Sequence, residues 1–288
     1  MRIRACATRS AETKTRIDLN PGLDGGSQDH PCRQDDRFMP TLFVIIPYYD
    51  EPATLEQCLR RVVDSNLPAD WRQEIILVDD HSGPEGSRCA DEVVSKLGQE
   101  GVGIRLERHD HNRGKGAAVR TGFRSAIRDA GEDDVMIIQD ADLEYDPRDF
   151  RLFLEPLAKD DADAVYGNRW NDQRDDRTSI GRMHELGNRM LTAFSNMLTG
   201  YRISDMECCY KAFPLPVLRC IIDDLDEDRF GIEPQLTASL SRHGYHVTEV
   251  PVRYEPRGFK AGKKIGMADG FSALRVMLRE RFRRSGDR

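Results

Sequence analysis

The chain has 288 residues, with 43 Lys and Arg against 50 Asp and Glu, and 39% of its residues are hydrophobic. The hydrophobic residues fall in compact blocks such as LFVII (42–46), which excludes disorder of the whole chain, and the length suits one large α/β domain. No apolar run approaches the roughly 18 residues of a membrane-spanning helix, and residues 1–16 lack the apolar stretch of a secretory signal. Seven cysteines without metal-ligand spacing favour a reducing cytoplasm.

The charges are unevenly distributed along the chain. Residues 253–288 hold 11 basic and 4 acidic side chains, residues 1–38 hold 7 and 6, and the residues between them hold 25 and 40. The acidic body argues against nucleic acid as a partner. The basic end suits a local anionic partner, which is either a phosphate or an anionic lipid surface, although a solvated basic terminus is the alternative.

After a polar leader over 1–38, the predicted elements alternate between strand and helix. The expected strands lie at 42–46, 74–78, 104–107, 135–139, 162–167 and 246–252. The expected helices lie around 55–62, 93–97, 119–127, 183–197, 231–243 and 271–282, and the polar stretch 171–179 is expected to be a mobile loop. Repeated strand–helix units predict a mostly parallel, Rossmann-like α/β sheet with helices on both faces.

Several strands end in polar side chains at the edge where parallel sheets bind ligands. These strand ends are Pro47 to Glu51, Asp79 to Gly83, Gln139 to Asp142 and Gly167 to Arg169. A single acidic strand end is commonly a helix cap. Several that converge on one edge predict a ligand site.

Asp140 and Asp142 directly follow a buried strand, with only Ala141 between them. Their carboxylates are expected on the same side, where two oxygen ligands suit Mg²⁺ or Mn²⁺ and leave positions open for substrate phosphates. Glu144 could add a third oxygen. The alternative is a turn and helix cap before Pro147.

The segment HNRGKGAAVRTG (111–122) places Arg113 and Lys115 beside two glycines at a helix start. Backbone N–H groups at such a start, with cations nearby, suit a phosphate. The glycine spacing is that of neither a P-loop nor a dinucleotide site. A tight turn that leads into an amphipathic helix is the alternative.

Eight short segments in a fixed order resemble glycosyltransferase family 2, above all its dolichyl- or polyprenyl-phosphate sugar synthase branch. They are VIIPYYDE (44–51), ILVDDHSG (76–83), NRGKGAAVRTG (112–122), QDADLEYDP (139–147), YGNR (166–169), SDMECCYKAF (204–213), FGIEPQL (230–236) and EVPVRYEPRGFKAGKK (249–264). The resemblance covers about residues 41–270. Similar enzymes often have Asn at 50 and Gln at 144, where this chain has Asp50 and Glu144. Their second segment usually reads Asp-Asp-x-Ser or Asp-Asp-Gly-Ser, and this chain has His81 at its third position.

The resemblance implies a GT-A fold over 39–270, with a nucleotide-sugar half over about 39–145 and an acceptor half over about 146–270. The leader 1–38 would precede this domain, and a basic amphipathic helix over 271–288 would follow it. This helix either lies on a membrane or packs on the domain.

The resemblance also implies roles for particular residues. The nucleotide-sugar donor would be bound by Pro47, Tyr49, Glu51, Asp79, Asp80, Lys115, Asp140, Ala141 and Asp142. Asp140, Asp142 and Glu144 would bind the metal, and Arg169, Arg182, Arg257 and Lys263 would bind the acceptor phosphate. Asp142, Arg169 and Asp205 would form the catalytic set.

The implied reaction is inverting, metal-dependent transfer of a hexose from a UDP- or GDP-sugar to polyprenyl or dolichyl phosphate. A lipid phosphate is already anionic, whereas a sugar hydroxyl acceptor would require a carboxylate base, either Asp205 or Glu233. The cationic segment 257–264 is expected to be a flap that closes over phosphate, with a solvated loop as the alternative.

Two other functions compete with this reading. A nucleotidyltransferase would carry a Gly-rich loop after the first strand, where this chain has Pro47 to Glu51. A nucleotide-sugar-binding relative without catalysis is disfavoured by the Asp140, Asp142 and Asp205 carboxylates. The expected location is the cytoplasm, with peripheral contact to the cytoplasmic face of a membrane, directly or through a membrane-protein partner.

Overall fold

The computed structural model describes residues 39–171, 179–256 and 267–283, and the side chains at 171, 179–184 and 267–269 lie outside that description. The leader expected over 1–38, most of the loop expected over 171–179 and the flap expected over 257–264 also fall outside it. All elements described below belong to one unit, Pro40–Arg288.

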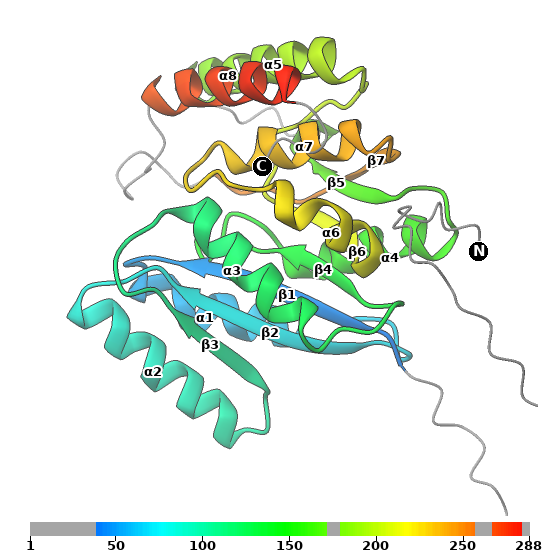
Figure 1. The fold of residues 1–288 in the computed structure, drawn as a ribbon. Coiled ribbons are helices and arrows are strands. Elements are labelled where there is room, and N and C mark those ends of the chain that lie inside the picture. Colours follow the sequence, from blue (N-terminus) through cyan, green and yellow to red (C-terminus); the bar gives the residue numbers. More distant parts are fainter. Residues whose placement is uncertain (1–38, 172–178, 257–266, 284–288) are drawn as a thin grey trace, which may run out of the picture. The chain divides into compact units, whose positions relative to one another are not determined.

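A seven-stranded sheet lies at the centre of the described residues, with strand order β3-β2-β1-β4-β6-β5-β7 (Figure 1). The strands are β1 (Thr41–Tyr48), β2 (Arg72–Asp79), β3 (Ile104–Arg108), β4 (Val135–Ile138), β5 (Ala164–Asn168), β6 (Lys211–Pro214) and β7 (Val247–Pro251). β6 runs antiparallel to β4 and β5, whereas the other neighbours pair in parallel. The predicted mostly parallel α/β sheet is therefore confirmed.

Helices cover both faces of this sheet; α3 lies in front of it and α1 behind it in Figure 1. The helices are α1 (Pro52–Val63), α2 (Pro84–Gln99), α3 (Lys115–Ile127), α4 (Phe150–Ala158), α5 (Ser179–Thr199), α6 (Leu215–Ile221), α7 (Ile232–Arg242) and α8 (Met267–Phe282). Within the described ranges, no helix combines the length and the apolar character that a membrane crossing requires.

The sequence patterns predict neither α4 nor β6, and they also miss the seven-residue helix α6. β6 has only four residues, too few for a period to show, and its extended form depends on its pairing with β4 and β5. α4 is short and contains Pro156, although Phe150, Phe153 and Leu154 form a buried face. Both elements depend on tertiary contacts more than on local propensity.

α3 approaches the sheet closely because Gly122 has no side chain. A Cβ at this position would lie 2.2 Å from Ile45 Cγ2 and 3.4 Å from Val78 Cγ2. Ile45 and Val78 are fully buried in adjacent strands, so neither can move aside easily. Gly122 therefore determines how closely α3, the helix that begins at Lys115, packs on the sheet.

We expect Gly122→Ala to lower the free energy of unfolding by about 1–3 kcal/mol, because overpacking outweighs the gain in helix propensity. Urea denaturation measures the change. The matched control is Gly98→Ala in α2, where an added Cβ meets nothing within 4 Å. The control should leave stability unchanged or raise it by up to about 1 kcal/mol. A Gly122→Ala protein as stable as the control would contradict this account of the packing.

Candidate active site

Three loops follow the carboxyl ends of the parallel strands β1, β2 and β4, and each contains a residue with a left-handed backbone. These residues are Asp50, with φ 48°, His81, with φ 62°, and Leu143, with φ 65°. Leu143 is strained most, because its side chain has no polar atom to offset the steric cost. Backbone strain of this kind concentrates at functional sites, which marks this edge of the sheet.

Hydrogen bonds tie the β1 loop to the β2 loop. The backbone N–H of Asp50 donates to Ser82 Oγ at 2.9 Å, and that of Gly83 donates to Asp50 Oδ1 at 2.8 Å. The donor-binding residues predicted from the β1 loop lie here: Pro47 and Glu51 are half-buried, and Tyr49 is 40% exposed. The loop therefore presents an aromatic ring at the sheet edge.

Asp79 organises the β2 loop. Its Oδ1 accepts a hydrogen bond from the Ser82 backbone N–H, its Oδ2 accepts one from Ser87 Oγ, both at 2.9 Å, and its side chain is buried. Burial would raise the pKa of Asp79, but the hydrogen bonds from Ser82, Ser87 and Arg108 lower it below its usual value. Asp79 is therefore a buried anion that shapes the loop, and its predicted contact with a nucleoside remains a prediction.

Asp80 holds the segment that leads into α3. Its oxygens accept hydrogen bonds from the backbone N–H groups of Arg113 and Gly114, at 2.9 and 2.7 Å, and from Asn112 Nδ2 at 3.0 Å. His109 Nδ1 lies 2.6 Å from Oδ1, and Asp80 is 3% exposed. Asp80 is predicted to bind the donor, and the structure shows that it positions the loop before Lys115.

Lys115, the first residue of α3, binds carboxylates from two distant parts of the chain. Its Nζ lies 2.9 Å from Asp140 Oδ1 and 3.0 Å from Glu233 Oε1. Burial alone would lower the pKa of this ammonium, but the Asp140 and Glu233 carboxylates hold it well above its usual value. Lys115 is therefore a permanent cation beside the aspartate pair.

Asp140 and Asp142 follow β4, as predicted, and both are partly accessible. Asp142 Oδ1 accepts a hydrogen bond from the Glu144 backbone N–H at 3.1 Å, whereas Glu144 Oε2 accepts one from Tyr254 Oη at 2.9 Å. Among the described residues, no group of three His, Cys, Asp or Glu side chains is arranged to hold a metal. Two carboxylates beside each other still fit an open site for a hard divalent cation, with phosphate and water oxygens as the other ligands. The role of Glu144 as a third ligand remains a prediction.

Arg169 and Asp205 form a buried ion pair. Arg169 Nε and an Nη atom each lie 2.7 Å from an Asp205 oxygen, and the Asp205 side chain is 0% exposed. The guanidinium also lies 4.9 Å from the centre of the Trp170 ring and 5.2 Å from that of Tyr254. The predicted base and the predicted phosphate ligand therefore bind each other, because neither charge could be buried alone.

The other predicted phosphate ligands are Arg182, Arg257 and Lys263. The backbone of Arg182 lies in α5, but its side chain is outside the described part of the chain, as are Arg257 and Lys263. Their roles remain predictions.

Sequence reasoning missed Glu207, which lies two residues after Asp205. Its Oε1 is buried and has no hydrogen-bond partner among the described residues. The same holds for Glu233 Oε2. Burial, and then the charge of Glu233, raise the pKa of Glu207 to about 7. Its position within SDMECCYKAF was the available signal, but burial became evident only in the fold.

A family model described as glycosyl transferase family 2 matches residues 43–222. The chain belongs to this family. The predicted family resemblance is thereby confirmed, and the chain is a glycosyltransferase. The match decides against the nucleotidyltransferase alternative.

Relatives in this family include proteins named for transfer to lipid phosphates. The UDP-N-acetylglucosamine–dolichyl-phosphate N-acetylglucosaminyltransferase of Methanococcus voltae is 24% identical over 82% of this chain and 94% of its own length. The undecaprenyl-phosphate 4-deoxy-4-formamido-L-arabinose transferase of Edwardsiella ictaluri is 26% identical over 74% of this chain. The chain spans 60% of the length of that protein, and 33% of the length of the 28% identical glycosyltransferase AglD of Haloferax volcanii.

A solved structure confirms the fold. Glucosyl-3-phosphoglycerate synthase of Mycobacterium tuberculosis, crystallised with Mn²⁺, UDP and glucosyl-3-phosphoglycerate, matches with a TM-score of 0.59. The two chains are 19% identical, and the match covers 86% of this chain and 82% of that one. The α/β fold is therefore of the predicted GT-A type.

The buried Glu207 predicts a pH dependence of stability. A carboxyl whose pKa is about 7 in the folded state and 4.5 in the unfolded state stays protonated up to a higher pH when the protein is folded. Stability should therefore fall as the pH rises from 4.5 to 7, by about 3 kcal/mol at about 1.4 kcal/mol per pKa unit. We expect Glu207→Gln to remove this loss, as measured by urea denaturation at pH 5 and pH 8.

The control is Glu155→Gln, which changes an exposed glutamate paired with Lys159. It should keep the pH dependence of the unaltered protein. An unchanged pH dependence in Glu207→Gln would show that Glu207 does not titrate in this range.

Proposed function

We propose that this glycosyltransferase moves a hexose from a UDP- or GDP-sugar to polyprenyl phosphate, with inversion and with Mg²⁺ or Mn²⁺. The observation that carries the proposal is the network of Asp140, Lys115 and Glu233 beside Asp142, at the carboxyl end of β4. The printed names of the archaeal and bacterial relatives support the lipid-phosphate acceptor. The complexes of the mycobacterial synthase with UDP and Mn²⁺ or Mg²⁺ support the donor and the metal.

The donor is proposed to lie along the carboxyl edge of β1, β2 and β4. Tyr49, with Pro47 and Glu51 beside it, would contact the nucleoside, while buried Asp79 and Asp80 keep the surrounding loops in place. Asp140, Ala141 and Asp142 would face the diphosphate. This assigns donor binding to about 39–145 and acceptor binding to about 146–270.

Charge on the leaving diphosphate is the main problem that the site must solve. A divalent cation held by Asp140 and Asp142 would supply positive charge there. Lys115 adds a fixed positive charge at the same place, because its ammonium already lies within 3.1 Å of both Asp140 oxygens. Preorganised charges of this kind act without reorganisation during the reaction.

A lipid phosphate acceptor needs cations and no base. Arg182, Arg257 and Lys263 are the proposed ligands for that phosphate. Arg169 would act with them only if its ion pair with Asp205 opened, so its first role is to keep Asp205, Trp170 and Tyr254 together. The enzyme would meet the lipid at the cytoplasmic face of a membrane, directly or through a membrane protein.

Transfer to a sugar hydroxyl is the second candidate function, and one observation favours it. Glu233 Oε1 binds Lys115, while Glu233 Oε2 is buried and has no hydrogen-bond partner among the described residues. A carboxylate with one free oxygen, close to the proposed metal ligand Asp140, could accept a proton from a hydroxyl acceptor. Glu233 therefore suits a base better than Asp205, both of whose oxygens bind Arg169.

We expect Asp142→Asn to reduce transfer from the preferred nucleotide sugar by about 100- to 1,000-fold, because the leaving group loses charge stabilisation. The assay offers labelled UDP- and GDP-sugars with Mg²⁺ or Mn²⁺ and a short-chain, water-soluble polyprenyl phosphate. Asp133→Asn, at the exposed amino end of β4, is the matched control and should keep full activity. Full activity in Asp142→Asn would reject the metal assignment, and donor binding without turnover on any acceptor would reject catalysis.

We expect Glu233→Gln to leave the shape of the pH–rate profile unchanged with polyprenyl phosphate, because that acceptor needs no deprotonation. Steady-state kinetics from pH 5 to pH 9 test this. The second candidate function makes two different predictions. Activity should appear only with a glycan acceptor, and Glu233→Gln should abolish the acidic limb of the pH–rate profile measured with that acceptor.

A further inference from the structure

Exposed apolar side chains concentrate on two helices. The structure describes eight large hydrophobic residues as exposed, and six of them lie on α5 or α8. They are Leu186 (59% exposed), Met190 (65%), Met197 (70%), Phe271 (70%), Leu278 (45%) and Phe282 (81%). Single exposed apolar residues need no explanation, but a cluster of this kind marks an interaction surface.

The spacing places these residues on one side of each helix. Leu186, Met190 and Met197 are separated by four and seven residues, and Phe271, Leu278 and Phe282 by seven and four, so each set forms a stripe along its helix.

The opposite sides of both helices are buried. Thr192 and Ser195 of α5, and Ala273, Met277 and Glu280 of α8, are all covered. α5 and α8 contact each other and α7, and Figure 1 shows them side by side above α7. Both stripes therefore point away from the sheet, and we name the six exposed residues together the α5–α8 surface.

The charged side chains of α8 that lie beside the α5–α8 surface are arginines. Between Phe271 and Phe282, the exposed charged residues are Arg275, Arg279 and Arg281. Arg279 binds Asp226 at 2.7 Å and the buried Glu280 at 2.9 Å, whereas Arg275 and Arg281 form no ion pair among the described residues. Arg189 on α5 is exposed but lies 2.6 Å from a Glu185 oxygen, so its charge is already paired. The surface thus combines apolar and basic side chains on a protein whose net charge is −7.

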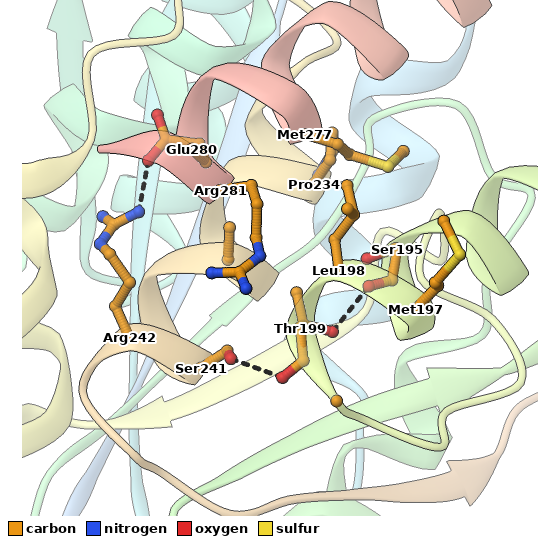
Figure 2. Close-up of a pocket in the computed structure, with 12 residues that line it drawn as sticks. Ser195, Met197, Leu198, Thr199, Pro234, Ser241, Arg242, Met277, Glu280 and Arg281 are labelled. Carbon is orange, nitrogen blue, oxygen red and sulfur yellow. Dashed lines mark hydrogen bonds and ion pairs between the residues drawn. The ribbon is translucent and has the colours of Figure 1, made fainter. Parts of the chain in front are cut away.

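A cavity of about 460 Å³ lies between α5, α7 and α8 (Figure 2). Met197 belongs both to its lining and to the α5–α8 surface, and Figure 2 shows Arg281 reaching down toward Thr199. Ser195 lines the cavity, is 1% exposed, and its Oγ has no hydrogen-bond partner among the described residues. Glu280 and Arg242 also line the cavity, and they bind each other. The Arg281 guanidinium and the Ser195 hydroxyl therefore remain to meet an anionic group.

We propose that the α5–α8 surface docks on an anionic phospholipid bilayer. The six apolar side chains enter the boundary between headgroups and acyl chains, Arg275 and Arg281 contact lipid phosphates, and a headgroup enters the cavity beside Arg281. A second copy of the chain fits less well, because a symmetric contact would set arginines against arginines. The proposal rests on the proposed function in one respect, since docking would bring the enzyme to a membrane-bound acceptor.

The test is cosedimentation of the full chain with vesicles of neutral phosphatidylcholine and with vesicles that also contain phosphatidylglycerol. We expect binding to the anionic vesicles that weakens as salt is added. The double variant Met190→Ser/Phe282→Ser should bind more than tenfold more weakly, since buried apolar area is lost. Arg275→Gln and Arg281→Gln should each weaken binding by about fivefold. The matched control is Val63→Ser, because Val63 is exposed on α1, outside the α5–α8 surface. This variant should bind the vesicles as the unaltered protein does.

Transfer to the short-chain, water-soluble acceptor separates the two proposals. All surface variants should keep this activity, whereas transfer to a long-chain acceptor in anionic vesicles should fall with their binding. Equal binding to neutral and anionic vesicles, or no binding, would overturn the docking proposal even if soluble transfer persists. A dimer in light scattering that Met190→Ser/Phe282→Ser dissociates, without a change in vesicle binding, would instead identify a contact between copies. Vesicle binding without any transfer would reject the proposed function and leave docking intact.

Discussion

The ammonium of Lys115 between Asp140 and Glu233 is the interaction on which the site depends. A parallel sheet brings the carboxyl ends of its strands to one edge, and in this chain those ends carry acidic residues. Asp140 and Glu233 are 22% and 6% exposed in their side chains, so water solvates neither of them fully. Without a cation between them, two poorly hydrated anions would repel each other, and removal of one partner from such a pair costs about 3–5 kcal/mol.

The position of Lys115 is determined by groups that never reach the edge of the site. Asp80 binds the backbone before α3, Gly122 lets α3 approach β1 and β2, and the Asp228 backbone oxygen accepts a hydrogen bond from Ala117 N–H at 3.0 Å. These contacts join residues from distant parts of the chain at the start of one helix. A charged group placed in this way needs little movement to meet a diphosphate, which is the property that electrostatic catalysis requires.

The same principle governs the second ion pair and the outer helices. Arg169 and Asp205 neutralise each other within a group of aromatic rings, and Glu280 is neutralised by Arg242 beneath α8. On the outer side of α8, by contrast, the arginines lie beside exposed phenylalanines. Arg169, Asp205 and Glu280 are thus buried and paired, while the exposed Arg275 and Arg281 of α8 accompany exposed apolar groups.

The sequence by itself determined the fold class, the strand ends that form the site and the family, because buried strands read as continuous apolar runs and the motifs follow one another in order. It also placed Asp140 and Asp142 at the edge of the sheet and Lys115 at the start of a helix. Only the tertiary structure decided that Asp80 positions a loop, that Asp205 binds Arg169 and that the Glu207 carboxyl oxygen Oε1 is buried. The physical reason is that these roles depend on which partner each charge meets across 29 to 36 residues of chain, or on desolvation, and neither is encoded in local spacing.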